Sequence, residues 1–258
     1  MTEDQEPSGQ YVQSLARGLS VIRAFGHERP SMTLSEIAEV TGLTRATARR
    51  FLLTLSELGY VRADGRMFAL TPRVLELGFS YLSGLGLPEI ITPQLESLSR
   101  QLNESASASV LDHGEIVYIA RAAARRIMAV SITVGTRFPA HATSMGRVLL
   151  AGLSPDELDD YLASIERPAL TEKTVVDSAA LRGTLDQVRE QGWALVDQEL
   201  EPGLRSIAAP LRGPTGAVLA AINVSTSTST ASLERISDEY RPALLRAAAS
   251  ISAGLSHL

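Results

Sequence analysis

Five arginines occur between residues 44 and 66, accompanied by only two acidic residues. Arginine can form two parallel hydrogen bonds with a phosphate group or with the edge of a guanine base, so such a cluster suits nucleic-acid binding. The whole chain carries a net charge of −5, but its acidic excess falls in residues 151–258. Because exposed charges are screened beyond about 8–10 Å in physiological salt, the local cluster decides which polyanion is attracted. Residues 44–66 are therefore a candidate DNA-binding surface.

The arginine cluster begins on the second of two predicted helices. The first helix follows Thr33, whose spacing from Glu36 is typical of a capping box, and it ends at Gly42. The second helix spans about residues 44–58 and carries apolar residues on one face. This spacing predicts a helix-turn-helix, a motif that places the start of its second helix in the DNA major groove. The residues expected to reach base edges are Thr44, Arg45, Ala46, Thr47, Arg49 and Arg50.

A hairpin is predicted directly after these helices. Residues 60–70 indicate two short strands around Asp64-Gly65, a dipeptide that favours a tight hairpin turn. A helix-turn-helix followed by such a hairpin predicts a winged DNA-binding domain, with Arg62 and Arg66 flanking the tip of the wing. These two arginines, together with Arg17 on an earlier predicted helix, are expected to contact phosphates. The same pattern leaves a second interpretation open, a helical bundle whose arginines form a solvated face.

The rest of the chain predicts a second domain of mixed strands and helices. This mixture favours an α+β fold with a sheet covered on one face, and one strand is expected at residues 126–134. Two helices predicted before it are expected to connect the domains and to pair protomers. The expected division is a disordered tail over residues 1–10, a winged helix-turn-helix domain over 11–71, linker and dimerisation helices over 72–103, and the second domain over 104–258.

One helix start in the second domain is a candidate anion site. Residues 142–146 follow His141 and begin a predicted helix, and the free amides and dipole of a helix start attract anions. Two further polar groups are expected to converge there, one formed by Asp197 with residues 203–206 and the other at the strand end that holds Asn223. The alternative is a plain capped helix without a ligand.

Several kinds of chemistry have no support in the sequence. The chain has no cysteine, which excludes disulfides, thiolate metal sites and a cysteine nucleophile. Its four histidines are scattered, and no nucleophile elbow, phosphate loop or paired metal-binding histidines occur. We therefore expect no catalytic residue, no metal, no cofactor and no enzyme activity. The polar N-terminus and the short apolar runs argue against a signal peptide and a membrane span, so we expect a cytoplasmic protein without a membrane partner.

Four blocks of the sequence are similar to those of a known family. They are YVQSLARGL at residues 11–19, RATARRFL at 45–52, TPRVL at 71–75 and RFPAHATSMGR at 137–147. Over nearly its full length the chain resembles the IclR family of bacterial regulators, and within it the subgroup that controls the β-ketoadipate pathway (PcaR, PobR and PcaU types). The resemblance implies a winged helix-turn-helix, a linker helix and a GAF-like α/β effector-binding domain.

The resemblance also implies partners and an effector site. The implied partners are a DNA operator, palindromic because the protein binds as a homodimer or a dimer of dimers, and a small organic acid such as protocatechuate, 4-hydroxybenzoate or β-ketoadipate. Arginines that could balance the acid are Arg121, Arg125, Arg126, Arg137, Arg147 and Arg205. The implied effector-binding residues are Ser144, Met145, Gly146, Asp197, Leu204, Arg205, Ser206, Asn223 and Ser225.

The function expected from these patterns is a ligand-responsive transcription regulator of aromatic acid catabolism. Two alternatives remain from the sequence, a winged-helix module that binds another protein and an enzyme that acts on a small acid. A DNA binder loses affinity steeply as salt rises, whereas an enzyme would turn the acid over.

Overall fold

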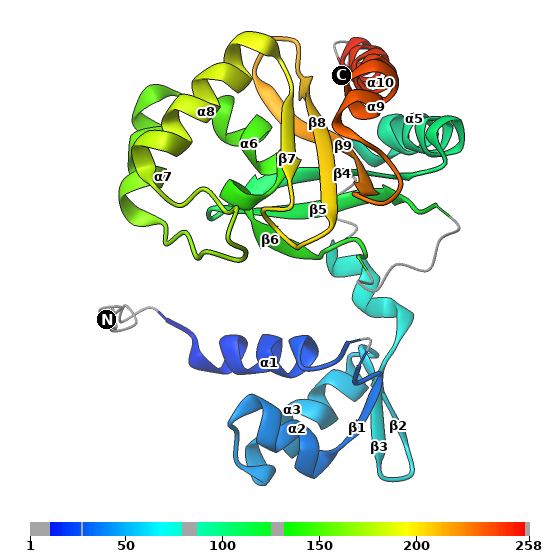
Figure 1. Ribbon diagram of the computed structural model, residues 1–258. Coiled ribbons are helices and arrows are strands. Elements are labelled where there is room, and N and C mark those ends of the chain that lie inside the picture. The colour runs from blue at the N-terminus through cyan, green and yellow to red at the C-terminus, as the bar shows by residue number, and fades with distance from the viewer. Residues whose placement is uncertain (1–10, 27, 79–86, 125–131, 256–258) are drawn as a thin grey trace. The chain divides into compact units, whose positions relative to one another are not determined.

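The computed structural model describes residues 11–26, 28–78, 87–124 and 132–255. The chain forms two compact units, residues 1–81 and 82–258, and each is described by itself (Figure 1). Within the described ranges, no helix combines the length and the apolar character needed to cross a membrane.

The first unit combines helices with a small antiparallel sheet. The strand order is β1-β3-β2, and β2 and β3 form the predicted hairpin. A core that includes the buried side chains of Val21, Ile37, Ala48 and Leu52 holds these elements together. Its elements are α1 (Gln13–Arg23), β1 (Ser31–Thr33), α2 (Leu34–Thr41), α3 (Arg45–Glu57), β2 (Val61–Asp64), β3 (Met67–Leu70) and the 3-10 helix η1 (Pro72–Val74).

The second unit is built on a six-stranded antiparallel sheet with the order β6-β5-β4-β9-β8-β7. The strands are β4 (Ser105–Asp112), β5 (Glu115–Ala122), β6 (Arg137–Pro139), β7 (Ala194–Asp197), β8 (Leu204–Arg212) and β9 (Val218–Ser227). The helices are α5 (Leu87–Leu102), the 3-10 helix η2 (Ala140–Ala142), α6 (Ser144–Ala151), α7 (Pro155–Ser164), α8 (Ser178–Gln191), α9 (Leu233–Arg235), the π-helical η3 (Ile236–Tyr240) and α10 (Arg241–Leu255).

Helices cover both faces of this sheet, whereas the sequence predicted one covered face. α5 and α10 pack on one face, and α6 packs on the other with α8 against it (Figure 1). The cause lies in the strands, which are apolar on both sides. In β9, Ile222 and Val224 point into the first core while Ala221 points into the second. The small side chains of Ala208 and Ala221 leave room for α6 on that face.

The predicted linker, residues 72–103, is divided in the structure. α5 covers most of its second half and belongs to the core of the second unit, whereas η1 belongs to the first unit. The helical spacing of apolar residues in α5 therefore serves burial against the sheet. The residues of α5 that are buried there are Leu87, Ile91, Leu95, Leu98 and Leu102. Pairing of protomers through residues 72–103 stays a prediction.

Smaller differences concern single elements. The three-residue strand β1 was not predicted, although it buries Met32 and pairs with β3. The predicted closing helix contains the π-helical segment η3. Of the predicted strand at residues 126–134, residues 132–134 form no strand and the remainder lies outside the described residues, as does the predicted tail over residues 1–10.

Candidate DNA interface and effector cavity

The helix-turn-helix is formed by α2 and α3. The Thr33 hydroxyl accepts a hydrogen bond from the Glu36 amide at 3.4 Å, and the Glu36 carboxylate accepts one from the Thr33 amide at 2.7 Å, which confirms the predicted capping box. Gly42 ends α2 with a φ of 65°, a left-handed conformation that glycine adopts without a steric penalty. Both ends of α2 are thus fixed, so α3 begins at a defined place.

The leading edge of α3 is exposed. Thr44 caps the helix by accepting a hydrogen bond from the Thr47 amide at 3.2 Å, and Thr47 is half-buried. Ala48 and Leu52 lie on the opposite, buried face. The exposed residues of the edge are Arg45, Ala46, Arg49 and Arg50. Within the described part of the chain, none of the guanidinium groups of these arginines has an ion pair or hydrogen bond, so they are available to another molecule.

The wing carries two further exposed arginines. Asp64 pairs with Met67, so the connection between β2 and β3 consists of Gly65 and Arg66, and Gly65 has a φ of 60°. Arg62 on β2 and Arg66 at the tip are exposed, and so is Arg17 on α1. The structure therefore leaves all nine residues predicted to contact DNA at least partly open to solvent.

One face of the second sheet carries a polar patch. In β4, Ser105, Ser107 and Ser109 alternate with Ala106 and Ala108, which belong to the core under α5 and α10. Since side chains alternate between the two faces of a strand, the serines point to the α6 side. Register places Asn223 and Ser225 of β9 beside Ser107 and Ser105. Because these side chains are short, they leave open space above the sheet.

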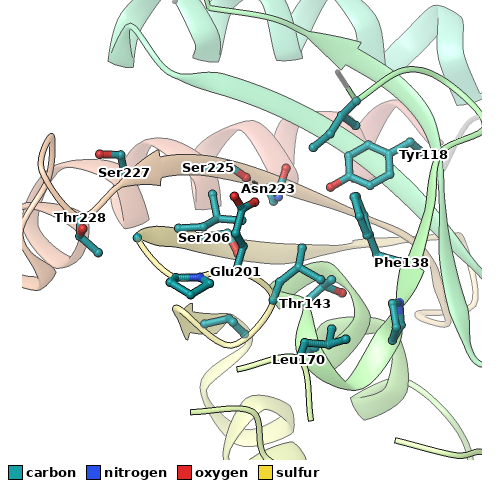
Figure 2. Close-up of a pocket in the computed structure, with 18 of the residues that line it drawn as sticks. Tyr118, Phe138, Thr143, Leu170, Glu201, Ser206, Asn223, Ser225, Ser227 and Thr228 are labelled. Carbon is teal, nitrogen blue, oxygen red and sulfur yellow. Dashed lines mark hydrogen bonds between the residues drawn. The ribbon is translucent and has the colours of Figure 1, made fainter. Parts of the chain in front are cut away.

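A cavity of about 650 Å³ lies over this polar face. A volume in the range of roughly 300–1,000 Å³ is usual for small-molecule sites. Figure 2 shows the aromatic rings of Tyr118 and Phe138 on one side of the cavity and polar residues of β8 and β9 on another. The two rings meet edge to face, 6.0 Å between centroids. Burial raises the pKa of Tyr118 to about 12, so its hydroxyl is a neutral donor near neutral pH.

Four of the predicted effector residues line the cavity, and they all come from strands. They are Leu204, Ser206, Asn223 and Ser225. Leu204 and Ser206 stand two residues apart on β8, as Asn223 and Ser225 do on β9, and therefore share a face. Asn223 is only 4% exposed, and its Oδ1 atom has no hydrogen-bond partner in the described residues.

The other five predicted effector residues do not line the cavity. Ser144, Met145 and Gly146 are buried where α6 packs, and Met145 Sδ accepts a hydrogen bond from Ser109 at 3.3 Å. Asp197 and Arg205 form an ion pair at 2.6 Å. Although burial opposes it, hydrogen bonds from Arg205, Lys173 and Gln198 hold the pKa of Asp197 below its usual value.

The arginines suggested as carboxylate partners have different surroundings. Arg147 is buried and pairs with Glu199 at 2.5 Å, and Arg137 pairs with Asp112 at 2.8 Å and Glu115 at 2.6 Å. Arg205 is paired with Asp197. Arg125 and Arg126 lie outside the described residues. Arg121 lines the cavity and, within the described part of the chain, has no carboxylate partner.

Several cavity residues escaped the sequence analysis. They are Tyr118, Phe138, Leu170 and Glu201, which come from separate elements and loops. Thr143 also lines the cavity, and it belongs to the segment 142–146 that the sequence marked as a candidate anion site. The alternation of Ser105, Ser107 and Ser109 with alanines was a usable signal, because it predicts a polar face on a strand with an otherwise apolar neighbour face. No comparable pattern marks the loop residues.

Gly146 is expected to tolerate no side chain. A Cβ atom there would lie 2.1 Å from the carbonyl oxygen of Ala140 and 2.4 Å from its Cα, so α6 or η2 must move. Gly146→Ala should destabilise the second unit by about 1–3 kcal/mol or more. The matched control is Gly183→Ala at an exposed position of α8, where a Cβ atom meets nothing within 4 Å. This substitution should stabilise the second unit by about 0.5–1 kcal/mol. Equal urea midpoints for the two variants would contradict the close packing of Gly146 against Ala140.

His141 is expected to make the second unit sensitive to acid. Burial, and next to it the charges of Arg167 and Arg147, lower the pKa of His141 below its usual value near 6.5. The unfolded chain therefore binds a proton that the folded chain resists, and the free energy of unfolding falls as the pH drops below about 6.5. Between pH 7.5 and 5.5, the free energy of unfolding should fall less in His141→Gln than in the wild-type protein. Urea unfolding at the two pH values measures this difference. An unchanged loss would show that other groups cause it.

The unfolding of the second unit can be followed separately. Trp193 is the single tryptophan of the chain and lies in this unit, where the Arg241 guanidinium stacks 5.2 Å from its ring. Its fluorescence therefore reports on the fold around β7 and α10. The Gly146 and His141 variants are best measured with this signal.

Comparisons with known proteins agree with this arrangement. The family model for the C-terminal domain of bacterial IclR transcriptional regulators matches residues 79–253, and the model for the IclR helix-turn-helix domain matches residues 14–65. The Pca regulon regulatory protein of Pseudomonas putida is 44% identical over 238 residues, which cover 92% of this chain and 82% of that protein.

Solved structures of similar proteins cover nearly the whole chain. A protein of Rhodococcus sp. RHA1, described as a transcriptional regulator, is 55% identical with a TM-score of 0.87, covering 96% of this chain and 99% of that one. An IclR homolog of Microbacterium hydrocarbonoxydans in complex with 4-hydroxybenzoate is 26% identical with a TM-score of 0.84, covering 95% and 100%. The curated relatives are transcriptional regulators and not enzymes. The chain belongs to the IclR family of bacterial transcriptional regulators, and within that family it is similar to the Pca-type proteins.

Proposed function

We propose that this protein regulates genes of aromatic acid catabolism in the β-ketoadipate and protocatechuate pathway, and that a small organic acid in the cavity controls its binding to an operator. The observation that carries the proposal is the combination of two features in one chain. The first unit presents exposed arginines whose guanidinium groups have no partner among the described residues, and the second unit holds a cavity that combines aromatic walls with polar groups. A DNA-binding regulator of this kind acts in the cytoplasm, where bacterial DNA lies.

The proposed DNA contacts follow from exposure and charge. Arg45, Arg49 and Arg50, with Thr44, Ala46 and Thr47, read base edges in the major groove. Arg17, Arg62 and Arg66 bind phosphates. A homodimer, or a dimer of dimers, presents two such surfaces and matches a palindromic operator whose half-sites lie about one helical turn apart, or a multiple of it.

The proposed effector is an organic acid of the protocatechuate, 4-hydroxybenzoate or β-ketoadipate class. Support comes from the Pca regulatory protein of P. putida and from the homolog that was crystallised with 4-hydroxybenzoate. A ligand shifts an equilibrium between two states only by its differential affinity for them. The acid therefore acts by favouring one arrangement of the DNA-binding units over another.

A DNA-binding titration tests the proposal. The intact protein is titrated onto labelled DNA that flanks its own gene, at salt concentrations from 50 to 200 mM, and onto unrelated DNA of the same length. We expect specific binding whose affinity falls steeply with salt, because bound arginines displace counterions from the phosphates. Equal affinity for both DNAs would contradict operator recognition at this site, and no salt-dependent binding to either DNA would favour the alternative of a protein-interaction module.

A further inference from the structure

We propose that Arg121 is the carboxylate anchor of the cavity and that Asn223 receives the hydroxyl group of the same ligand. The ligand is thus a hydroxylated aromatic monocarboxylic acid with its carboxylate at β5 and its hydroxyl at β9. This inference rests on the proposed function, because it specifies which acid the cavity takes and in which orientation.

Strand register places the two groups in one row across the sheet. Ser107 of β4 pairs with Arg121 of β5 on one side and with Asn223 of β9 on the other. Two strand spacings amount to about 9–10 Å, a span that one benzene ring with polar groups at opposite ends bridges between the two side chains. Tyr118 and Phe138 provide the apolar wall against which such a ring packs.

Among the described residues, no carboxylate pairs with the Arg121 end of the row. The hydrogen bonds that its guanidinium group donates to described residues are long, 3.5 Å to the Ser107 hydroxyl and 3.4 Å to the Ser105 hydroxyl. Burial lowers the pKa of Arg121, yet a guanidinium group stays protonated in proteins. A half-buried cation without a carboxylate partner is costly, and a ligand carboxylate removes that cost with two charge-assisted hydrogen bonds.

The Asn223 end of the row lacks a hydrogen-bond donor. The side-chain amide donates to the Ser225 hydroxyl at 3.0 Å, but the buried Oδ1 atom accepts nothing within the described residues. A buried acceptor without a partner costs free energy, so a donor on the ligand is favoured there. A phenolic hydroxyl fills this role, whereas a carboxylate offers no proton.

Glu201 bears on how many negative charges the ligand can carry. This residue lines the cavity from the loop between β7 and β8, where its side chain reaches inward (Figure 2). Although Glu201 is exposed and solvent therefore screens its charge, that charge disfavours a second carboxylate on the ligand, because like charges repel. Among the candidate effectors, the aromatic monocarboxylates are therefore favoured over a dicarboxylate such as β-ketoadipate.

Isothermal titration of the intact protein tests this assignment with four probes. 4-Hydroxybenzoate carries both groups, benzoate lacks the hydroxyl, 4-hydroxybenzamide lacks the charge, and adipate carries two carboxylates. We expect 4-hydroxybenzoate to bind at least about tenfold more tightly than each of the others. Each of the other probes leaves one buried polar group of the cavity without its partner, and such a loss weakens binding by about this factor. Adipate binding as tightly as 4-hydroxybenzoate would overturn the orientation.

Substitutions separate the two ends of the ligand. Arg121→Met should weaken 4-hydroxybenzoate about ten- to hundredfold but leave 4-hydroxybenzamide within about threefold, while Arg121→Lys restores part of the loss. Asn223→Leu should remove the advantage of 4-hydroxybenzoate over benzoate. The control is Arg246→Met, which removes an exposed charge of α10 and should leave the affinity for all four probes unchanged.

The outcomes distinguish this inference from the proposed function. Suppose that the wild-type protein binds 4-hydroxybenzoate, but that Arg121→Met binds it equally well or loses affinity for the acid and the amide alike. The assignment of Arg121 as the carboxylate anchor is then wrong, while the proposed sensing of an acid is retained. If the wild-type protein binds none of the acids, acid sensing itself fails. Trp193 fluorescence during urea unfolding shows whether each variant keeps the fold of the second unit.

Discussion

Replacing Arg49 and Arg50 together by alanine is expected to lower the affinity for operator DNA by about 2–6 kcal/mol, because each bidentate base contact contributes roughly 1–3 kcal/mol. Both residues lie on the exposed edge of α3, and their guanidinium groups have no partner within the described part of the chain. Their removal leaves the buried face with Ala48 and Leu52 untouched, so the first unit should remain folded. The effect should be much smaller on unrelated DNA, since base contacts contribute only to specific binding.

Fluorescence anisotropy with operator and unrelated DNA measures this difference. Arg246→Ala in the second unit serves as the control for net charge, because it removes one exposed arginine far along the chain from α3. A wing variant, Arg66→Ala, should weaken binding to both DNAs to a similar degree and reduce the salt slope by about one. If the α3 double variant loses affinity for both DNAs equally, the assignment of base contacts to α3 is wrong.

Glu199→Gln is expected to destabilise the second unit by about 3–5 kcal/mol, the usual cost of breaking a buried ion pair on one side. Arg147 is 3% exposed, pairs with Glu199 at 2.5 Å and donates a further hydrogen bond to the His141 carbonyl at 3.1 Å. Glu199 also accepts the Val175 amide at 3.0 Å. The pair thus ties α6 to the segments before α8 and after β7, and its loss leaves a buried guanidinium group without a counter-charge.

Urea unfolding followed by Trp193 fluorescence provides the measurement. The double variant Arg147→Met, Glu199→Leu should recover much of the lost stability, because two apolar side chains replace both charges at once. Arg182→Gln, which breaks the exposed ion pair with Asp159, is the control and should cost at most about 1 kcal/mol. If Glu199→Gln lowers the free energy of unfolding by no more than Arg182→Gln does, the buried ion pair contributes little to the stability of the second unit.

The first unit was largely predictable because its signals are local. Thr33 with Glu36, Gly42, and Asp64-Gly65 each specify a helix start, a helix end or a turn within a few residues. The helices and the hairpin follow from them directly. β1 was missed because a three-residue strand has no periodic pattern, and it forms only by pairing with β3.

The cavity was predictable where strands line it and less so where helices and loops do. Ser206, Asn223 and Ser225 line it because alternation along β8 and β9 sets which residues share a face. Ser144 and Met145 were expected to line it, yet α6 turns them inward. That direction depends on how Gly146 packs against Ala140 and how α6 meets the sheet, which the local sequence does not encode. The coverage of both sheet faces by helices likewise depends on contacts between residues far apart in the sequence.

Acid binding in the second unit is expected to change DNA binding by the first unit, and operator affinity with and without acid measures this coupling. The intact protein is titrated onto labelled operator DNA in the absence of acid and at a saturating concentration of 4-hydroxybenzoate, at constant salt. We expect a change in operator affinity of about five- to 150-fold, the usual range of allosteric coupling. In Arg121→Met the same acid concentration should change operator affinity less, because that variant binds the acid about ten- to hundredfold more weakly. An operator affinity that stays the same while calorimetry shows the acid bound would contradict this coupling.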